Sequence, residues 1–182
     1  MSVSNISLAV QALKAGEVIA YPTEAVYGLG CDPFNRHALE KLFHVKQRPI
    51  EKGVILVAAS VEQVLPYIEL MDTEWQERVL ASWPGPVTWV LPLKKALPEW
   101  ITGGRNTVAI RVSDHPTVQA LCVEFGSPIV SSSANLTGLP PARSCEEVKE
   151  MFGESLLCVQ GSLGILKQPT QIRDAVSGQV LR

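Results

Sequence analysis

The chain has 182 residues, which is enough to bury a hydrophobic core and matches the usual size of one domain. An apolar fraction of 46% with 19% charged residues excludes an intrinsically disordered protein, and a net charge of −2 excludes a surface that is basic all over. The sequence has no apolar run of membrane-spanning length and no basic N-terminal region followed by a long apolar stretch. We therefore predict a cytoplasmic protein with no membrane contact and a single domain over residues 1–182.

Helical and strand patterns alternate along the chain. Apolar residues spaced three and four apart predict helices over residues 6–13, 38–45, 75–80, 118–125 and 148–152. Short apolar runs predict strands over residues 18–21, 54–59, 87–93, 107–112 and 128–130, followed from residue 156 by short strands and loops. This alternation is typical of an α/β fold with helices packed on a sheet. Several connections are too short to hold a crossover helix, so we predict a mixed sheet.

Several helix ends carry a local signal. Residues that can cap a helix stand at three predicted starts, namely Asn35, Thr73 with Gln76, and Ser144 with Glu147. Glycine stands at two predicted ends, Gly16 and Gly126. These residues place the helix bounds more closely than apolar spacing alone.

The first polar cluster follows directly on the strand at 18–21. It reads Tyr-Pro-Thr-Glu-Ala-Val-Tyr-Gly-Leu-Gly over residues 21–30, and its proline and glycines predict a loop. Thr23 offers a hydroxyl that both donates and accepts hydrogen bonds. On these residues alone, a turn with a satisfied threonine is the simpler interpretation, and a binding loop is the alternative.

The second cluster is Lys46-Gln47-Arg48, at the end of the helix over 38–45, with Lys52 soon after. Pro49 forces the chain out of helical geometry at this point. Two cations two residues apart at a helix end can both reach one anion, and arginine can bind a phosphate through two hydrogen bonds. The alternative is a favourable interaction of these charges with the negative end of the helix dipole.

The third cluster, Ser131 to Asn135, lies where the strand over 128–130 ends. Polar side chains there are costly unless backbone, a ligand or an ion partners them. Hydroxyl and amide groups can hold phosphate oxygens or magnesium-bound water. The alternative is a turn in which these side chains bond to their own backbone.

Several familiar site patterns are missing from the sequence. It has no glycine-rich nucleotide loop and no nucleophile elbow. Its histidines are scattered, and no metal site held by the protein is predicted. The cysteines stand apart without metal-binding spacing, so we expect four reduced thiols, none of them catalytic, at Cys31, Cys122, Cys145 and Cys158.

The order of the motifs is more specific than any one of them. They are Tyr-Pro-Thr-Glu at 21–24, Tyr-Gly-Leu-Gly at 27–30, Lys-Gln-Arg-Pro at 46–49, Trp-Pro-Gly-Pro-Val-Thr at 83–88, Val-Ala-Ile-Arg-Val-Ser-Asp-His-Pro at 108–116 and Ser-Ser-Ser-Ala-Asn-Leu-Thr-Gly at 131–138. Together they closely resemble the YrdC/TsaC family of threonylcarbamoyl-AMP synthases. The resemblance runs from about residue 8 to the end of the chain, and it is to the short, single-domain TsaC branch.

The resemblance implies a twisted α/β fold of the YrdC-like kind, with a concave and locally basic face. It also implies a nucleotidyltransferase that makes threonylcarbamoyl-AMP and pyrophosphate from ATP, L-threonine and bicarbonate. The product would serve the threonylcarbamoyladenosine modification of tRNA, through a tRNA-modification transferase complex. Mg²⁺ would arrive with ATP, held mainly by the phosphates.

The family's two signatures, K-x-R and S-x-N, are matched by Lys46 with Arg48 and by Ser133 with Asn135. By resemblance, Lys46 and Arg48 bind the phosphates of ATP. Ser133 and Asn135 position the nucleotide phosphate and threonine. Attack on phosphorus needs charge neutralisation and alignment more than an acid–base pair, and such a site agrees with that need.

For the amino acid, the resemblance places Thr23 against threonine and makes Arg111 the partner of its carboxylate. Looser matches imply nucleotide contacts at Thr107, Arg143 and Arg182. The family's late serine segment appears here as Pro-Thr-Gln-Ile-Arg-Asp at 169–174, which leaves the role of Thr170 in doubt. Arg182 is the final residue, where mobility is expected.

An RNA-binding module without chemistry is the alternative of a different class. It is favoured by a run of basic residues, Arg36, Lys41, Lys46, Arg48 and Lys52. Against it stand the net charge of −2, the lack of an RNA-recognition signature, and an S-x-N cluster that binding of a phosphate backbone does not need. We expect at most weak RNA binding with a steep salt dependence.

Overall fold

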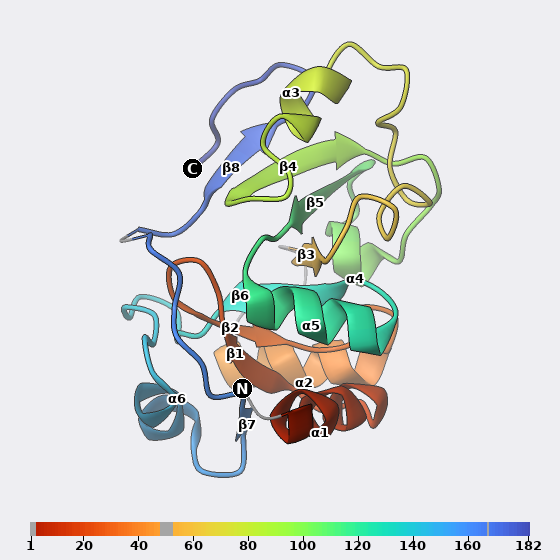
Figure 1. Ribbon diagram of the computed structural model, residues 1–182. Coiled ribbons are helices and arrows are strands. Elements are labelled where there is room, and N and C mark those ends of the chain that lie inside the picture. Colours follow the sequence, from red (N-terminus) through yellow and green to blue (C-terminus); the bar gives the residue numbers. More distant parts are fainter. Residues whose placement is uncertain (1–2, 48–52, 167) are drawn as a thin grey trace.

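The computed structural model describes residues 3–47, 53–166 and 168–182 and shows a mixed sheet with helices packed against it (Figure 1). The strands are β1 (Ile19–Pro22), β2 (Tyr27–Gly30), β3 (Ile55–Ala58), β4 (Val87–Pro92), β5 (Thr107–Val112), β6 (Ile129–Ser133), β7 (Leu157–Cys158) and β8 (Gln171–Asp174). The helices are α1 (Val3–Lys14), α2 (Arg36–Lys46), α3 (Gln76–Leu80), α4 (Glu99–Thr102), α5 (Pro116–Phe125) and α6 (Cys145–Phe152). The predicted α/β class is confirmed.

The strands lie in the order β7-β1-β2-β6-β3-β5-β4-β8. Neighbours are parallel in the pairs β7–β1, β3–β5 and β4–β8, and antiparallel in the other four, so the predicted mixed sheet is confirmed. β6 is antiparallel to both of its neighbours. Its polar end therefore lies beside the starts of β2 and β3.

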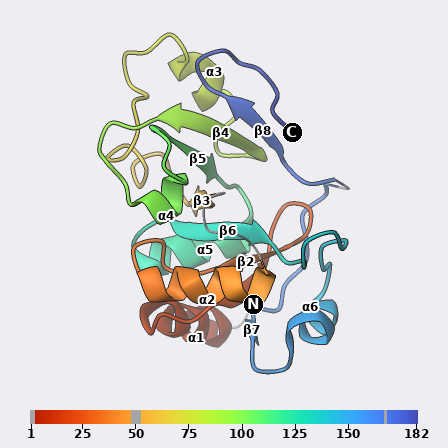
Figure 2. The ribbon, with the colours of Figure 1, turned by 180° about the vertical axis from the view of Figure 1, so that it is seen from behind.

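Successive side chains of the strands enter separate cores because a strand alternates its two faces. In β1, Ile19 and Tyr21 pack with α1 and α5, whereas Ala20 packs with α2. Figures 1 and 2, which differ by a half-turn, show α5 in front of the sheet in one view and α2 in front in the other. The sheet is therefore covered on both faces by helices whose apolar sides the sequence had predicted.

The helix ends follow local capping chemistry in most places. The Asn35 side chain accepts a hydrogen bond from the Ala38 N–H at 3.2 Å, and the Ser144 hydroxyl accepts one from the Glu147 N–H at 3.2 Å, as predicted. Gly126 ends α5 with a φ of 86°, a left-handed conformation that glycine adopts without strain. Within the described residues, no helix is both long and apolar enough to cross a bilayer.

Two local predictions were wrong. Residues 27–30, expected to be a loop, form β2, because the Thr23 N–H donates to the Val26 carbonyl at 3.2 Å and closes a tight hairpin with β1. Thr73 does not cap α3: its hydroxyl donates to the Leu70 carbonyl at 2.6 Å, and the helix begins at Gln76.

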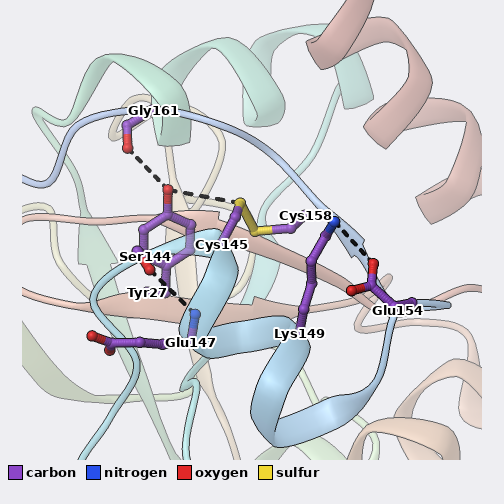
Figure 3. Close-up of a disulfide and its surroundings, with 8 residues drawn as sticks. All are labelled: Tyr27, Ser144, Cys145, Glu147, Lys149, Glu154, Cys158 and Gly161. Carbon is purple, nitrogen blue, oxygen red and sulfur yellow. Dashed lines mark hydrogen bonds and ion pairs between the residues drawn. A yellow bond between two sulfur atoms is a disulfide. The ribbon is translucent and has the colours of Figure 1, made fainter.

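The prediction of four reduced thiols is wrong for one pair. Cys145, at the start of α6, and Cys158, in β7, form a disulfide with their Cα atoms 5.8 Å apart (Figure 3). Their separation of 13 residues along the chain does not indicate a disulfide. Cys158 is held in place by the pairing of β7 with β1, a contact that the sequence does not reveal. The other two cysteines, Cys31 and Cys122, are free and buried, and burial raises the pKa of Cys122 to about 12.

Reduction of the Cys145–Cys158 disulfide is expected to lower the free energy of unfolding by about 2–3 kcal/mol, because the bond restrains a short loop of the unfolded chain. Thermal melting with and without dithiothreitol measures the effect. The double variant Cys145→Ser, Cys158→Ser is the control and should melt at one temperature in both buffers. Equal melting temperatures for oxidised and reduced wild type would contradict the prediction.

Candidate functional site

A cavity of about 580 Å³ lies against β5, with Thr107, Ala109 and Arg111 in its wall. These residues alternate along the strand, so they point to one face of the sheet. Arg111 pairs in register with Val57, which packs in the core formed by α1 and α5. The cavity therefore opens on the face of those helices, beyond the part they cover. In Figure 1, α5 lies over β6, while β4 and β8 lie clear of it.

The charge of the cavity wall is positive. Arg105, Arg111 and Arg182 line it, and among the residues that the structure describes no aspartate or glutamate does. Partial burial and the positive charge of Arg111 lower the pKa of Arg182 from its ordinary value. Arginine stays charged in proteins even so. A concave site with clustered positive charge favours an anionic ligand.

The guanidinium of Arg111 is almost completely buried, and hydroxyl groups hold one side of it. Its Nη1 lies 3.0 Å from the Thr170 hydroxyl and 3.4 Å from the Thr88 hydroxyl. Its Nη2 lies 3.3 Å from Oε2 of Glu24. The second carboxylate oxygen, Oε1, accepts a hydrogen bond from the Ser113 hydroxyl at 2.6 Å. Arg111 is thus fixed by side chains from the β1–β2 turn, β4 and the segment before β8.

The doubtful residue Thr170 lies inside this arrangement. It is buried, lines the cavity and accepts a hydrogen bond from Arg111. Thr23, from the β1–β2 turn, lines the same cavity, and its hydroxyl donates to the Val26 carbonyl at 2.8 Å. The structure therefore places Thr23, Arg111 and Thr170, the three residues that the sequence analysis considered as threonine contacts, in the wall of one cavity.

The S-x-N residues lie at the exit of β6 and line the cavity. The Ser133 hydroxyl donates to the Asn135 side-chain oxygen at 2.6 Å. The Asn135 amide donates in turn to the carbonyls of Leu136 and Leu139 at 2.9 and 3.0 Å. The polar exit thus forms its own hydrogen-bonded turn, which fixes the two side chains at the cavity wall.

Lys46 of the K-x-R motif lies at the end of α2. Its side chain is buried, and its ammonium donates to the carbonyls of Ser133 and Asn135, the second at 2.9 Å. Gln47 follows α2 in a left-handed conformation with a φ of 49°. Through its two hydrogen bonds, Lys46, the last residue of the helix, lies against the S-x-N turn. Arg48, the other half of the K-x-R motif, lies outside the described residues.

Two of the three looser nucleotide matches lie in the cavity wall, and the third does not. Thr107 and Arg182 line the cavity, whereas Arg143 does not and instead donates to the Ala25 carbonyl at 3.2 Å. The backbone of Arg182 makes hydrogen bonds in both directions with Ile172, at 3.1 and 3.3 Å. The terminal arginine is therefore tied to β8 by its backbone, unlike the mobile end that was expected.

Two charged residues of the site had no role in the sequence analysis. Arg105 lines the cavity and donates to the Thr102 carbonyl at 3.2 Å, but no pattern around it indicated a site. Glu24 stands in the first motif. The signal for a site there was a charged residue between the apolar strand over 18–21 and the apolar pair Ala25-Val26. Its partner Arg111 is 87 residues away along the chain (111 minus 24), so the pair itself could not be read from the sequence.

The described residues include no group of three or more His, Cys, Asp or Glu side chains that could hold a metal. Glu24 is engaged by Arg111 and Ser113. Mg²⁺ at this site would therefore take phosphate oxygens and water as its main ligands, which agrees with its preference for oxygen and its reluctance to lose water.

The sequence matches the Sua5/YciO/YrdC family, described as "Telomere recombination", over residues 11–182. The threonylcarbamoyl-AMP synthase of Photobacterium profundum is 53% identical over 182 residues, covering 98% of both chains. The protein of the same name from Photorhabdus laumondii is 51% identical over 173 residues, covering 94% of this chain and 92% of the relative.

Solved structures of two proteins, Sua5 and YciO, superpose on most of this chain. Sua5 of P. abyssi complexed with L-threonine superposes with a TM-score of 0.88 at 32% identity, covering 97% of this chain and 53% of the other. The chain thus spans about half of that longer protein. YciO of E. coli has a TM-score of 0.80 at 29% identity, covering 93% of this chain and 82% of the other. A nucleotide-bound HypF, at 22% identity and a TM-score of 0.79, shows likeness of fold alone.

Replacing Arg111 with methionine is expected to cost about 3–5 kcal/mol of stability, because the Glu24 carboxylate is then buried without its counter-charge. The double variant Arg111→Met, Glu24→Gln should recover part of this loss, since neither charge remains. Urea unfolding of both single variants and the double variant tests the coupling. Strictly additive losses would show that the two side chains do not stabilise each other.

Proposed function

The chain belongs to the Sua5/YciO/YrdC family, and from this we propose that it makes threonylcarbamoyl-AMP from ATP, L-threonine and bicarbonate. Relatives of about half identity over nearly the full chain carry this activity in their names. The observation that carries the proposal is the cationic cavity, where Arg111 lies at one end and the S-x-N turn lines the wall. The substrates bring a carboxylate and a triphosphate, both anionic.

In the proposed reaction, the amine of threonine takes up bicarbonate, giving an N-carboxy group and water. An oxygen of the new carboxylate then attacks the α-phosphorus of ATP, and the bond to pyrophosphate breaks. The protein has to align two anions and neutralise the charge that shifts to the leaving pyrophosphate. Fixed cations and hydroxyl donors do this without an acid–base pair, and the site supplies such groups.

We place the amino acid at the Arg111 end. The guanidinium binds the threonine carboxylate, while Thr23 and Thr170 lie close enough to contact the amino acid. Glu24 and the hydroxyls of Thr88 and Thr170 hold Arg111 in a single orientation before the substrate binds. Preorganised charge costs no rearrangement when the substrate binds, which is the property that favours catalysis.

We place the nucleotide at the S-x-N turn. Ser133 and Asn135 contact phosphate, and Lys46 supports them through their own carbonyls. Arg48 is assigned to the ATP phosphates from the K-x-R motif alone. Further nucleotide contacts are assigned to Thr107, Arg182 and, as an addition to the sequence-based set, Arg105, all of which line the cavity. Arg143 is assigned from the family resemblance alone, because its guanidinium donates to the Ala25 carbonyl and it does not line the cavity. Mg²⁺ enters with ATP and adds positive charge to its phosphates.

The remaining partners are proposed from the same resemblance. The product passes to a tRNA-modification transferase complex in the cytoplasm. RNA contact is at most weak. Arg36 pairs with Glu40 at 2.8 Å and Lys41 with Glu17 at 2.7 Å, so part of the basic run along α2 is already neutralised.

The direct test is pyrophosphate release. Purified protein with ATP, Mg²⁺ and bicarbonate should release pyrophosphate only when L-threonine is added, and the adenylate product should appear in equal amount. Release that ignores threonine would sink the proposed reaction. Tight RNA binding that survives physiological salt, without threonine-dependent release, would support the RNA-binding alternative.

Loss of either K-x-R cation should slow the reaction. Arg48→Ala is expected to reduce turnover by roughly 30- to 1000-fold, the range for losing one charge-assisted donor at a site of developing charge. Lys46→Met is expected to reduce turnover by roughly 100-fold, the cost of misplacing site groups by about 1 Å, because it removes the ammonium that holds the Ser133 and Asn135 carbonyls. Lys41→Met is the matched control, because Lys41 lies on the same helix and pairs with Glu17 instead. Thr23→Ala should mainly raise the KM for threonine.

Circular dichroism confirms that each variant is folded before its kinetics are compared. Near-normal turnover of folded Lys46→Met and Arg48→Ala would show that the phosphate site is placed wrongly. An equal rise in the KM for ATP and threonine in Thr23→Ala would contradict its place at the amino-acid end.

A further inference from the structure

The chain between β7 and β8 lies against the β1–β2 turn, and we call its residues 160–166 the strap. Four hydrogen bonds attach it: Tyr27 Oη to the Gly161 carbonyl at 2.9 Å, His115 Nε2 with the Ser162 carbonyl at 3.1 Å, the Gly164 N–H to the Thr23 carbonyl at 3.0 Å, and the Leu166 N–H to the Glu24 carbonyl at 3.1 Å. Figure 3 shows the Tyr27 hydroxyl directed at Gly161. The strap is thus bonded to the backbone of two site residues.

Gly164 makes the closest approach in this arrangement. A Cβ at this position would lie 2.7 Å from the Glu24 carbonyl oxygen, 2.8 Å from its Cα and 3.1 Å from its carbonyl carbon. All three are backbone atoms, so no side-chain rotation can relieve the contact. Any side chain at 164 must push the strap and the β1–β2 turn apart.

The groups on either side of this contact are those that surround Arg111. Thr23 lines the cavity, and Glu24 supplies the carboxylate 3.3 Å from the guanidinium. The chain that leaves the strap delivers Thr170, which accepts a hydrogen bond from the same guanidinium. Arg111 is therefore held between two segments whose separation is set at Gly164.

We propose that Gly164 is a positioning residue for the amino-acid end of the cavity: its missing side chain lets the strap and the β1–β2 turn close together on Arg111. The inference rests on the proposed function, since it assigns the threonine carboxylate to Arg111. Lys46 and residues 136 and 139 hold the S-x-N turn, and the turn meets the β1–β2 hairpin at Tyr27 and Gly28, outside the backbone of residues 23 and 24 that contacts the strap. We therefore expect displacement of the strap to affect the nucleotide end less than the amino-acid end.

The size of the effect follows from the contact distances. An added Cβ at 2.7 Å must gain about 0.7–1.3 Å to reach ordinary contact, and a misplacement of about 1 Å in a catalytic site can cost roughly 100-fold. Gly164→Ala should therefore raise the KM for threonine at least about tenfold. The KM for ATP should change less than about twofold.

The experiment titrates threonine and ATP separately in the pyrophosphate assay and measures threonine binding by calorimetry. Ile165→Ala is the matched control, because Ile165 is the next residue of the strap and is 97% exposed. It should behave as wild type. A purely structural role for Gly164 would lower the melting temperature without separating the two KM values.

Tyr27→Phe is the second variant, which removes one tether of the strap without adding bulk. It should raise the KM for threonine by about two- to fivefold. If Gly164→Ala is folded and keeps the wild-type KM and affinity for threonine, the proposal is overturned. If Gly164→Ala does not fold, an unchanged threonine KM in Tyr27→Phe overturns it instead. Wild type that shows no threonine-dependent release refutes the proposed function, a separate result.

Discussion

The site depends on keeping one guanidinium charged, buried and in a fixed place. Arg111 is almost completely buried, so the protein supplies most of its partners, and they come from four parts of the chain: Glu24, Thr88, Thr170 and, through Glu24, Ser113. A buried charge that loses its partner destabilises the fold by several kcal/mol. The β1–β2 turn, β4, β5 and the segment before β8 are therefore held in a single arrangement by the same group that is proposed to bind substrate.

The mixed sheet is what brings these segments together. Because β6 runs antiparallel to both β2 and β3, its hydroxyl-rich end lies beside the starts of those strands. The parallel pairing of β3 with β5 then puts Arg111 in register with Val57, on the same face. α2 approaches from the opposite face, and Lys46 at its end reaches the carbonyls of the S-x-N turn. In a purely parallel sheet, the end of β6 would lie at the opposite edge from the starts of β2 and β3.

Local chemistry made much of the fold predictable. Apolar spacing and the caps Asn35 and Ser144 placed helices correctly, because those signals act within one turn of chain. Apart from the capping error at Thr73, which is local, the failures were non-local. The strand at 27–30 depends on hairpin pairing with β1, and the Cys145–Cys158 bond depends on β7 joining the same edge. In the site, most residues carried a motif signal, but the burial of Lys46 and the hydrogen bond between Arg111 and Thr170 depend on contacts between distant parts of the chain.

The ion pair at the centre of the site is loose, and this bears on how Arg111 can act. Ser113 occupies Oε1 of Glu24, so a single carboxylate oxygen faces the guanidinium, at 3.3 Å. Among the residues that the structure describes, neither that oxygen nor Nε of Arg111 has a hydrogen-bond partner. The remaining contacts of the guanidinium are neutral hydroxyls, which orient it without cancelling its charge. A closer, two-point pairing would have held Arg111 more firmly but directed more of its charge away from the cavity. The observed geometry keeps enough attraction to fix the arginine and leaves positive potential for the threonine carboxylate that we propose it binds.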